Sequence, residues 1–208
     1  MSSQPVRLCV YCASSERVDQ RYRLVALELG TAIAGEGWEL VYGGGSIGLM
    51  GDVARAALRG GARVTGIIPH RLAGREIALD SVSELIRTDT MRERKALMDA
   101  RSDAFVVLPG GIGTMEELVE IVTLKQLGFH DRAIVVIDAD GYWDPLLVQL
   151  QRMVDQRMAD ARLLTLWEVA HDVDEALAAV RAYQPGMVAG PTAAMEIEAV
   201  EAPPQGGG

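Results

Sequence analysis

A short apolar strand, a glycine turn and a helix follow one another without interruption near the middle of this chain. Residues 104–108 are a run of β-forming side chains, and residues 109–113 read Pro-Gly-Gly-Ile-Gly. From Thr114 onward the apolar residues recur at helical spacing. Glycines let the backbone approach a ligand closely, and the free N–H groups at a helix start attract negative charge. The stretch therefore predicts a phosphate-binding site.

The remaining chain alternates between predicted strands and predicted helices. Strands are expected at residues 6–12, 38–42, 62–68, 83–88, 133–137 and 166–171, and helices at 22–35, 52–58, from 91, 142–158 and 174–183. This alternation predicts an α/β fold with a parallel sheet covered on both faces and right-handed crossovers. One domain is expected over residues 1–183. Residues 184–208 are rich in Pro, Gly, Ala and Glu without periodicity, which predicts a disordered tail.

Composition indicates which binding partners and which cellular compartment to expect. The 208 residues carry a formal net charge of −9, which disfavours nucleic acid and anionic membranes as partners. A charged, apolar leader and a membrane-spanning run are both missing from the sequence, so we expect a cytoplasmic protein. Cys9 and Cys12 fall in a predicted strand, where residues three apart point to opposite faces, so neither a redox pair nor a metal site is expected.

A second glycine loop, at residues 43–48, follows the predicted strand 38–42 and contains G-x-G-x-x-G. A dinucleotide site also needs an acid near the end of the next strand, but that strand runs into Pro69, His70 and Arg71. NAD is therefore not expected, and without a Walker lysine neither is NTP hydrolysis. We predict no cofactor. A tight strand-to-helix turn remains the structural alternative for this loop.

Two carboxylates, Glu116 and Glu117, lie in the first turn after the central glycine loop. Acids at a helix start are favoured by the helix dipole, which is the structural explanation. If a phosphate also binds there, the carboxylates must point past it, toward the hydroxyls or the reacting carbon of a sugar. Glu116, Glu120 and Thr123 share one polar helix face, and Glu117 projects separately. Together these features predict a sugar-phosphate pocket.

Three other segments could contribute to that pocket. Thr90 and Glu93 fit a capping box, and the helix that they begin carries Arg94 and Lys95 beside Met91 and Met98. Arginine suits a forked grip on phosphate or carboxylate. The polar loop 70–80, which includes Glu76, could cover a ligand, although most loop carboxylates are simply solvated. Ser14 and Ser15 form either a turn before a helix or a hydrogen-bonding wall of the pocket.

Residues 109–117, Pro-Gly-Gly-Ile-Gly-Thr-Met-Glu-Glu, resemble the P-G-G-x-G-T-x-x-E motif of the Lonely Guy family, the cytokinin riboside 5′-monophosphate phosphoribohydrolases, long mislabelled lysine decarboxylases. Residues 42–51 and the Met91-x-x-Arg94-Lys95 element also resemble that family, in its order and at its spacing. The resemblance covers roughly residues 7–183. Arg92 stands where many members have His, which bears on substrate preference more than on the chemistry.

The resemblance implies a Rossmann-like doubly wound fold, a homodimer with active sites near the subunit contact, and hydrolysis of a nucleoside 5′-monophosphate such as AMP to base and ribose 5-phosphate. It implies Arg94 and Glu117 as catalytic residues. It also implies substrate contacts at Glu76, Arg94, Lys95, Gly111, Ile112, Gly113, Thr114, Met115, Glu116, Glu117 and Thr123.

Two other functions remain to be weighed. A lysine decarboxylase would need pyridoxal phosphate on Lys95 or Lys125, the chain's two lysines, and neither lies in a glycine loop. A non-catalytic carrier of a nucleotide or of the molybdenum cofactor would keep the phosphate loops without needing the acid pair. The presence of both Glu117 and Arg94 favours the enzyme, because cleavage of a C1′–N bond passes through an oxocarbenium-like sugar that negative charge stabilises.

Overall fold

The computed structural model describes residues 4–73 and 78–186. Its strands are β1 (Arg7–Tyr11), β2 (Glu39–Tyr42), β3 (Val64–Pro69), β4 (Glu84–Thr88), β5 (Ala104–Val107), β6 (Ala133–Ile137) and β7 (Glu168–Ala170). Its helices are α1 (Gln20–Gly35), α2 (Gly48–Arg59), α3 (His70–Ala73), α4 (Met91–Ala100), α5 (Ile112–Gln126), α6 (Asp144–Asp155) and α7 (Val173–Ala182), with 3₁₀ turns at Ala139–Gly141 and Ala161–Thr165.

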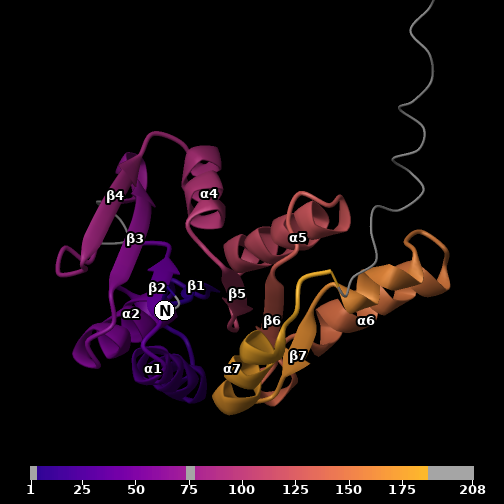
Figure 1. The fold of residues 1–208 in the computed structure, drawn as a ribbon, viewed down its shortest axis with the longest axis horizontal. Coiled ribbons are helices and arrows are strands. Elements are labelled where there is room, and N and C mark those ends of the chain that lie inside the picture. Colours follow the sequence, from indigo (N-terminus) through magenta and orange to yellow (C-terminus); the bar gives the residue numbers. More distant parts are fainter. Residues whose placement is uncertain (1–3, 74–77, 187–208) are drawn as a thin grey trace, which may run out of the picture.

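The strands form one parallel sheet in the order β4-β3-β2-β1-β5-β6-β7 (Figure 1). In its middle, Leu8 of β1 is in register with Leu40 of β2 on one side and with Ala104 of β5 on the other. Successive residues of a strand face opposite sides of a sheet. Both faces are apolar in the middle of the sheet, which is why β5 and β6 are continuous hydrophobic runs.

Two hydrophobic cores lie on the two faces of the sheet. Val106 of β5 belongs to the core under α1, α2 and α7, and its neighbour Phe105 belongs to the core under α5 and α6 (Figure 1). Helices α1 and α2 pack closely because Gly30 has no side chain: a Cβ there would lie 2.3 Å from the carbonyl oxygen of Val53. The predicted doubly wound α/β fold is confirmed.

The two cysteines lie in different cores, as the strand spacing predicts. Cys9 packs with Phe105 under α5, and Cys12 packs in the core under α1 and α2. Both are free thiols, and burial raises the pKa of Cys9 to about 12 and that of Cys12 well above its ordinary value. Such thiols resist conversion to the reactive thiolate.

The sheet order places a crevice between β1 and β5. The chain leaves β1 toward α1 in one layer and leaves β5 toward α5 in the other, so the two connections diverge above the carboxyl ends of neighbouring strands. Ligands of open α/β sheets bind at such a switch point. The central glycine loop therefore lies where the fold makes room for a ligand.

Several predicted boundaries differ from those observed. Helix α5 begins at Ile112 rather than Thr114, and the segment predicted as loop from residue 70 begins with the short helix α3. Helix α6 starts at Asp144, after the 3₁₀ turn Ala139–Gly141, and not at residue 142. Glu76 and residues 187–208 of the predicted tail, which was expected to begin at residue 184, lie outside the described residues. Within the described ranges, no helix has the length and apolarity needed to span a bilayer.

Candidate active site

The first turn of α5 presents free backbone amides. Gly111 is the N-cap residue, and no side chain caps the helix there. The amide of Met115 already bonds to the Gly111 carbonyl at 3.0 Å, which leaves the amides before it for another acceptor. Gly111, Ile112 and Gly113 are exposed. These amides and the helix dipole can together hold an anion.

The loop in front of α5 is held in place from three sides. A Cβ on Gly110 would lie 2.1 Å from the hydroxyl oxygen of Thr114, so this position requires glycine. The Pro109 carbonyl accepts a hydrogen bond of 3.2 Å from the amide of Ala13, after β1. The hydroxyl of Tyr142 donates to the Gly110 carbonyl at 2.6 Å. These contacts fix the loop before any ligand binds.

Arg94 and Glu117 form a buried ion pair across the gap between α4 and α5. Nη1 of Arg94 lies 3.1 Å from Oε1 of Glu117, and each side chain is 5% exposed. The guanidinium also donates to the carbonyl oxygens of Ile67 at 3.1 Å and of Gly43 at 3.5 Å. Arg94 therefore orients the Glu117 carboxylate and ties it to the ends of β2 and β3.

The second glycine loop makes room for that arginine. A Cβ on Gly43 would lie 2.1 Å from Nη2 of Arg94, and one on Gly44, at φ +79°, would lie 2.9 Å from the Cβ of Ile68. Close packing thus explains both glycines without a dinucleotide. The turn alternative considered for this loop is consistent with these contacts.

Charged side chains of α1 and α2 also hold the second glycine loop, residues 43–48, in place. Arg55 donates to the Ser46 carbonyl at 2.7 Å and to buried Asp52 at 2.9 Å, and Arg23 of α1 donates to Asp52 at 2.7 Å. Burial raises the pKa of Asp52, but the hydrogen bonds from the two arginines outweigh it, and the net pKa is lowered. Asp52 is therefore charged at neutral pH.

Lys95 connects the neighbouring acids of α5. Its ammonium group forms an ion pair with Glu116 and lies 3.0 Å from Oε2 of Glu120. Burial lowers the pKa of Lys95, but its hydrogen bonds to Glu116 and Glu120 raise it by more. The shared face predicted for Glu116 and Glu120 is thus confirmed, and Glu117 projects separately toward Arg94.

The structure does not bring all the predicted residues together. Thr123 lies farther along α5, where its hydroxyl donates to the Val119 carbonyl at 2.7 Å and it borders an apolar groove against α6. Ile112 is 78% exposed, and Met115 packs partly into the core under α5. The predicted capping box is confirmed in part: Thr90 accepts from the Glu93 amide at 3.1 Å, but Glu93 accepts from Asp89 rather than from Thr90.

Sequence reasoning missed Tyr142 as a support of the glycine loop. Its position just after β6, another strand ending at the same edge, is the signal that could have identified it. The role of the Gly43 and Ile67 carbonyls was also missed, because backbone acceptors leave no mark in a sequence. Within the described ranges, no group of His, Cys, Asp and Glu side chains could hold a metal ion.

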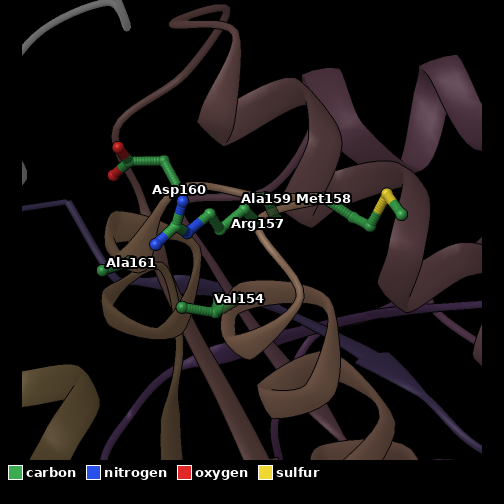
Figure 2. Close-up of a pocket in the computed structure, with 6 residues that line it drawn as sticks. All are labelled: Val154, Arg157, Met158, Ala159, Asp160 and Ala161. Atoms are coloured by element: carbon green, nitrogen blue, oxygen red, sulfur yellow. The ribbon is translucent and has the colours of Figure 1, made fainter.

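Two hollows on the surface need to be distinguished. A cavity of about 250 Å³ lies beside the central glycine loop, bounded by Ser15, Tyr22, Gly111 and Tyr142 among others. The other hollow, shown in Figure 2, lies where α6 ends and is lined by Val154 and residues 157–161. It contains none of the predicted site residues, whereas the predicted site residue Gly111 lines the first cavity.

The comparisons with known proteins identify the family of this chain. A family model described as "Possible lysine decarboxylase" matches residues 50–180. A cytokinin riboside 5′-monophosphate phosphoribohydrolase of Arabidopsis thaliana is 40% identical over 179 residues, which are 86% of this chain and 84% of the relative. The chain belongs to the Lonely Guy family. A probable phosphoribohydrolase of the same name from Oryza sativa subsp. japonica is 47% identical over 154 residues, 74% of this chain and 66% of the relative.

The fold is also shared with solved structures of proteins that carry other names. The molybdenum cofactor carrier protein of Chlamydomonas reinhardtii superposes with a TM-score of 0.64 at 24% identity, covering 86% of this chain and 97% of the carrier. At that identity the likeness concerns the fold alone.

The contacts of the two lysines do not support the decarboxylase activity named in the family description. Lys95 is paired with two glutamates, and buried Lys125 donates to the Arg132 carbonyl at 2.9 Å.

Proposed function

We propose that this chain hydrolyses the N-glycosidic bond of a nucleoside 5′-monophosphate, such as AMP or isopentenyladenosine monophosphate, to give the free base and ribose 5-phosphate. The observation that carries the proposal is the buried Arg94–Glu117 pair next to the uncapped start of α5. Relatives that match most of the chain carry the name of this activity. The chemistry follows from what each group can do.

The phosphate would bind at the amides of residues 111–114. These amides belong to an uncapped helix start whose loop is fixed by Tyr142 and by the connection after β1. Backbone donors at a helix N-terminus hold a phosphate without a lysine or a metal. The anion is thereby anchored, and the sugar extends toward the acids of α5.

Glu117 would stabilise the sugar as the bond to the base breaks. The electron pair of the C1′–N bond leaves with the base, a water oxygen bonds to C1′, and one proton of that water ends on the base. C1′ carries positive charge on the way, so a carboxylate fixed nearby in a water-poor site favours the transition state. The same carboxylate can accept the proton of the water. Arg94 keeps Glu117 oriented, and as a guanidinium it is not a proton donor.

Glu116 would accept hydrogen bonds from the ribose hydroxyls. Its side chain is 53% exposed and is tethered by Lys95, so the carboxylate is accessible without being free to move away. The family resemblance adds Glu76, Met115 and Thr123 to the proposed substrate contacts. We include the dimer in the proposal because Val119 and Phe129, at α5 and just after it, are 46% and 74% exposed and could be covered by a second copy. A cytoplasmic location belongs to the same proposal.

Incubation of the purified protein with AMP, followed by chromatography for adenine, tests the proposal. The unsubstituted protein should release adenine and ribose 5-phosphate in equal amounts. Glu117→Gln should reduce the rate by about 100-fold or more, because it removes the charge that stabilises the sugar. Near-normal adenine release by Glu117→Gln would remove Glu117 from this role.

A carrier of a nucleotide or of the molybdenum cofactor is the second candidate. The shared fold of the Chlamydomonas carrier favours it, but a likeness at 24% identity concerns the fold alone and not the function. A carrier would bind AMP without turnover. Tight binding with no adenine after prolonged incubation would therefore favour the carrier over the hydrolase.

A further inference from the structure

We propose that Glu120 is a positioning residue that makes the site selective for ribonucleotides over 2′-deoxyribonucleotides. Glu120 shares the ammonium group of Lys95 with Glu116, and this sharing keeps carboxylate oxygens of Glu116 available to the hydroxyls of the sugar. The inference rests on the proposed function, because it assumes that the sugar of a nucleoside monophosphate lies beside Glu116. It gives a role to Glu120, which the proposed catalysis does not use.

The basic residues of α4 are divided between the acids of α5, the helix beside it (Figure 1). Arg94 pairs with buried Glu117 at 3.1 Å and is therefore not available to Glu116. Lys95 forms an ion pair with Glu116 and lies 3.0 Å from Oε2 of Glu120. One ammonium group thus lies between two carboxylates, so the acids outnumber the cation that they share.

The position of Glu120 along α5 sets the direction in which Lys95 is drawn. Glu120 lies about 6 Å farther from the start of the helix than Glu116, which is about one turn. Because the phosphate is proposed to bind at that start, Glu120 draws the ammonium group away from the substrate. Lys95 contacts Oε1 of Glu116. A carboxylate has about four acceptor positions on its two oxygens, so Glu116 keeps acceptors for the sugar hydroxyls.

Stability alone does not explain the contact between Lys95 and Glu120. The Glu120 side chain is 40% exposed, and ion pairs with such exposure contribute little to folding because water screens them. The buried Arg94–Glu117 pair already connects α4 to α5. Burial lowers the pKa of Lys95, but its hydrogen bonds to Glu116 and Glu120 raise it by more, so the ammonium group is charged at neutral pH.

Removing the charge of Glu120 should change how Glu116 meets the sugar. In the variant Glu120→Gln, the ammonium group of Lys95 keeps Glu116 as its carboxylate partner and can contact both of its oxygens. A sugar hydroxyl would then lose its hydrogen bond to Glu116. A ligand without that hydroxyl has no such bond to lose. The variant should therefore bind ribose and deoxyribose ligands with more similar affinities.

Calorimetry on the full chain with ribose 5-phosphate and with 2-deoxyribose 5-phosphate tests this assignment. Neither ligand has a base, so no bond is cleaved during the measurement. We expect the unsubstituted protein to bind ribose 5-phosphate about tenfold more tightly, and Glu120→Gln to reduce that ratio to about twofold. Binding of 2-deoxyribose 5-phosphate should stay within about twofold. The matched control Glu28→Gln removes the same charge from the exposed face of α1 and should leave the ratio unchanged.

A double variant separates positioning of Glu116 from a general effect on the two helices. In a Glu116→Gln background, Glu120→Gln should not change the ratio further, because it acts through Glu116. Lys95→Met gives an independent route: without the ammonium group, the loss of Glu120 should no longer alter the ratio. An unchanged ratio in Glu120→Gln, equal weakening of both ligands, or a further fall in either background would overturn the assignment.

Adenine release from AMP by the unsubstituted protein is measured separately. In that assay Glu120→Gln should raise KM by about fivefold and leave kcat within about twofold, since it weakens binding of the sugar and spares Glu117. Release of adenine with no change in the ligand ratio refutes the role of Glu120 alone. A changed ratio without release refutes the hydrolase alone.

Discussion

Replacing Glu117 with leucine would leave a buried cation without its carboxylate. The Arg94 guanidinium would keep the backbone carbonyls of Ile67 and Gly43 as acceptors. A guanidinium cannot lose its proton to escape burial, and Arg94 is only 4% exposed. Breaking a buried ion pair from one side costs about 3–5 kcal/mol. For a chain of this length we therefore expect the melting temperature to fall by roughly 6–20 °C.

Two further variants separate charge from shape. Glu117→Gln keeps an acceptor for Arg94 and should cost about 1–2 kcal/mol. The double variant Arg94→Met with Glu117→Leu removes both charges and should recover to within about 1 kcal/mol of the unsubstituted protein, because an apolar pair needs no compensation. All three variants should lose adenine release, whatever their stability.

Urea unfolding followed by circular dichroism gives the free energies, and adenine chromatography on the same preparations gives the rates. A cost below about 1 kcal/mol for Glu117→Leu would refute the claim that the pair is buried and coupled. A double variant as unstable as the single one would refute it as well. If the double variant kept its activity, the pair would have no part in catalysis.

Three smaller perturbations test the surroundings of the site. Gly43→Ala places a methyl group against the Arg94 guanidinium, and we expect kcat for AMP to fall by about 100-fold in a folded protein. Tyr142→Phe removes the hydrogen bond to the Gly110 carbonyl and should raise KM by about threefold to tenfold with little change in kcat. The lowered pKa of Asp52 means that its contribution to stability is present above its ordinary pKa and disappears as the pH falls through the folded value. Asp52→Asn should therefore destabilise at pH 7 by about 1–2 kcal/mol and flatten the acid side of a plot of stability against pH.

The sheet was predictable from the sequence because its inner strands are buried on both faces and therefore are rich in apolar residues. Residues 133–137 match β6 in full, and the other strands differ from their predicted ranges by one or two residues at one or both ends. The apolar runs in the sequence end close to the residues at which the strands leave the two hydrophobic cores, so the runs mark the strand limits. Helix starts were harder to place: α5 begins at Ile112 because Gly111 serves as its cap, whereas the apolar rhythm appears only from Thr114.

The directions of the acidic side chains of α5 were predicted correctly, but the burial of Arg94, the partner of Glu117, was not predicted. Helical periodicity alone separated Glu116 and Glu120 from Glu117, and the ion pairs follow that division. Arg94 was recognised from its place in a basic pair beside apolar residues, but its burial was not predictable. That burial depends on Gly43 leaving space from a different strand, and such a long-range contact has no periodicity.

Thr123 shows the limit of helical periodicity. It shares a face with Glu116 and Glu120 on an ideal helix, yet it bonds to its own helix at the Val119 carbonyl and lies beside the groove against α6. A threonine in a helix often satisfies its hydroxyl in this way. A shared helix face therefore indicated that the side chains of Glu116, Glu120 and Thr123 point the same way, but not that they have the same function.

A crystal structure with carbocyclic AMP would test the central claim most directly. The account predicts the phosphate on the amides of residues 111–114 and the Glu117 carboxylate within reach of C1′, directly or through one water. A phosphate bound elsewhere, or a sugar turned away from Glu117, would contradict it.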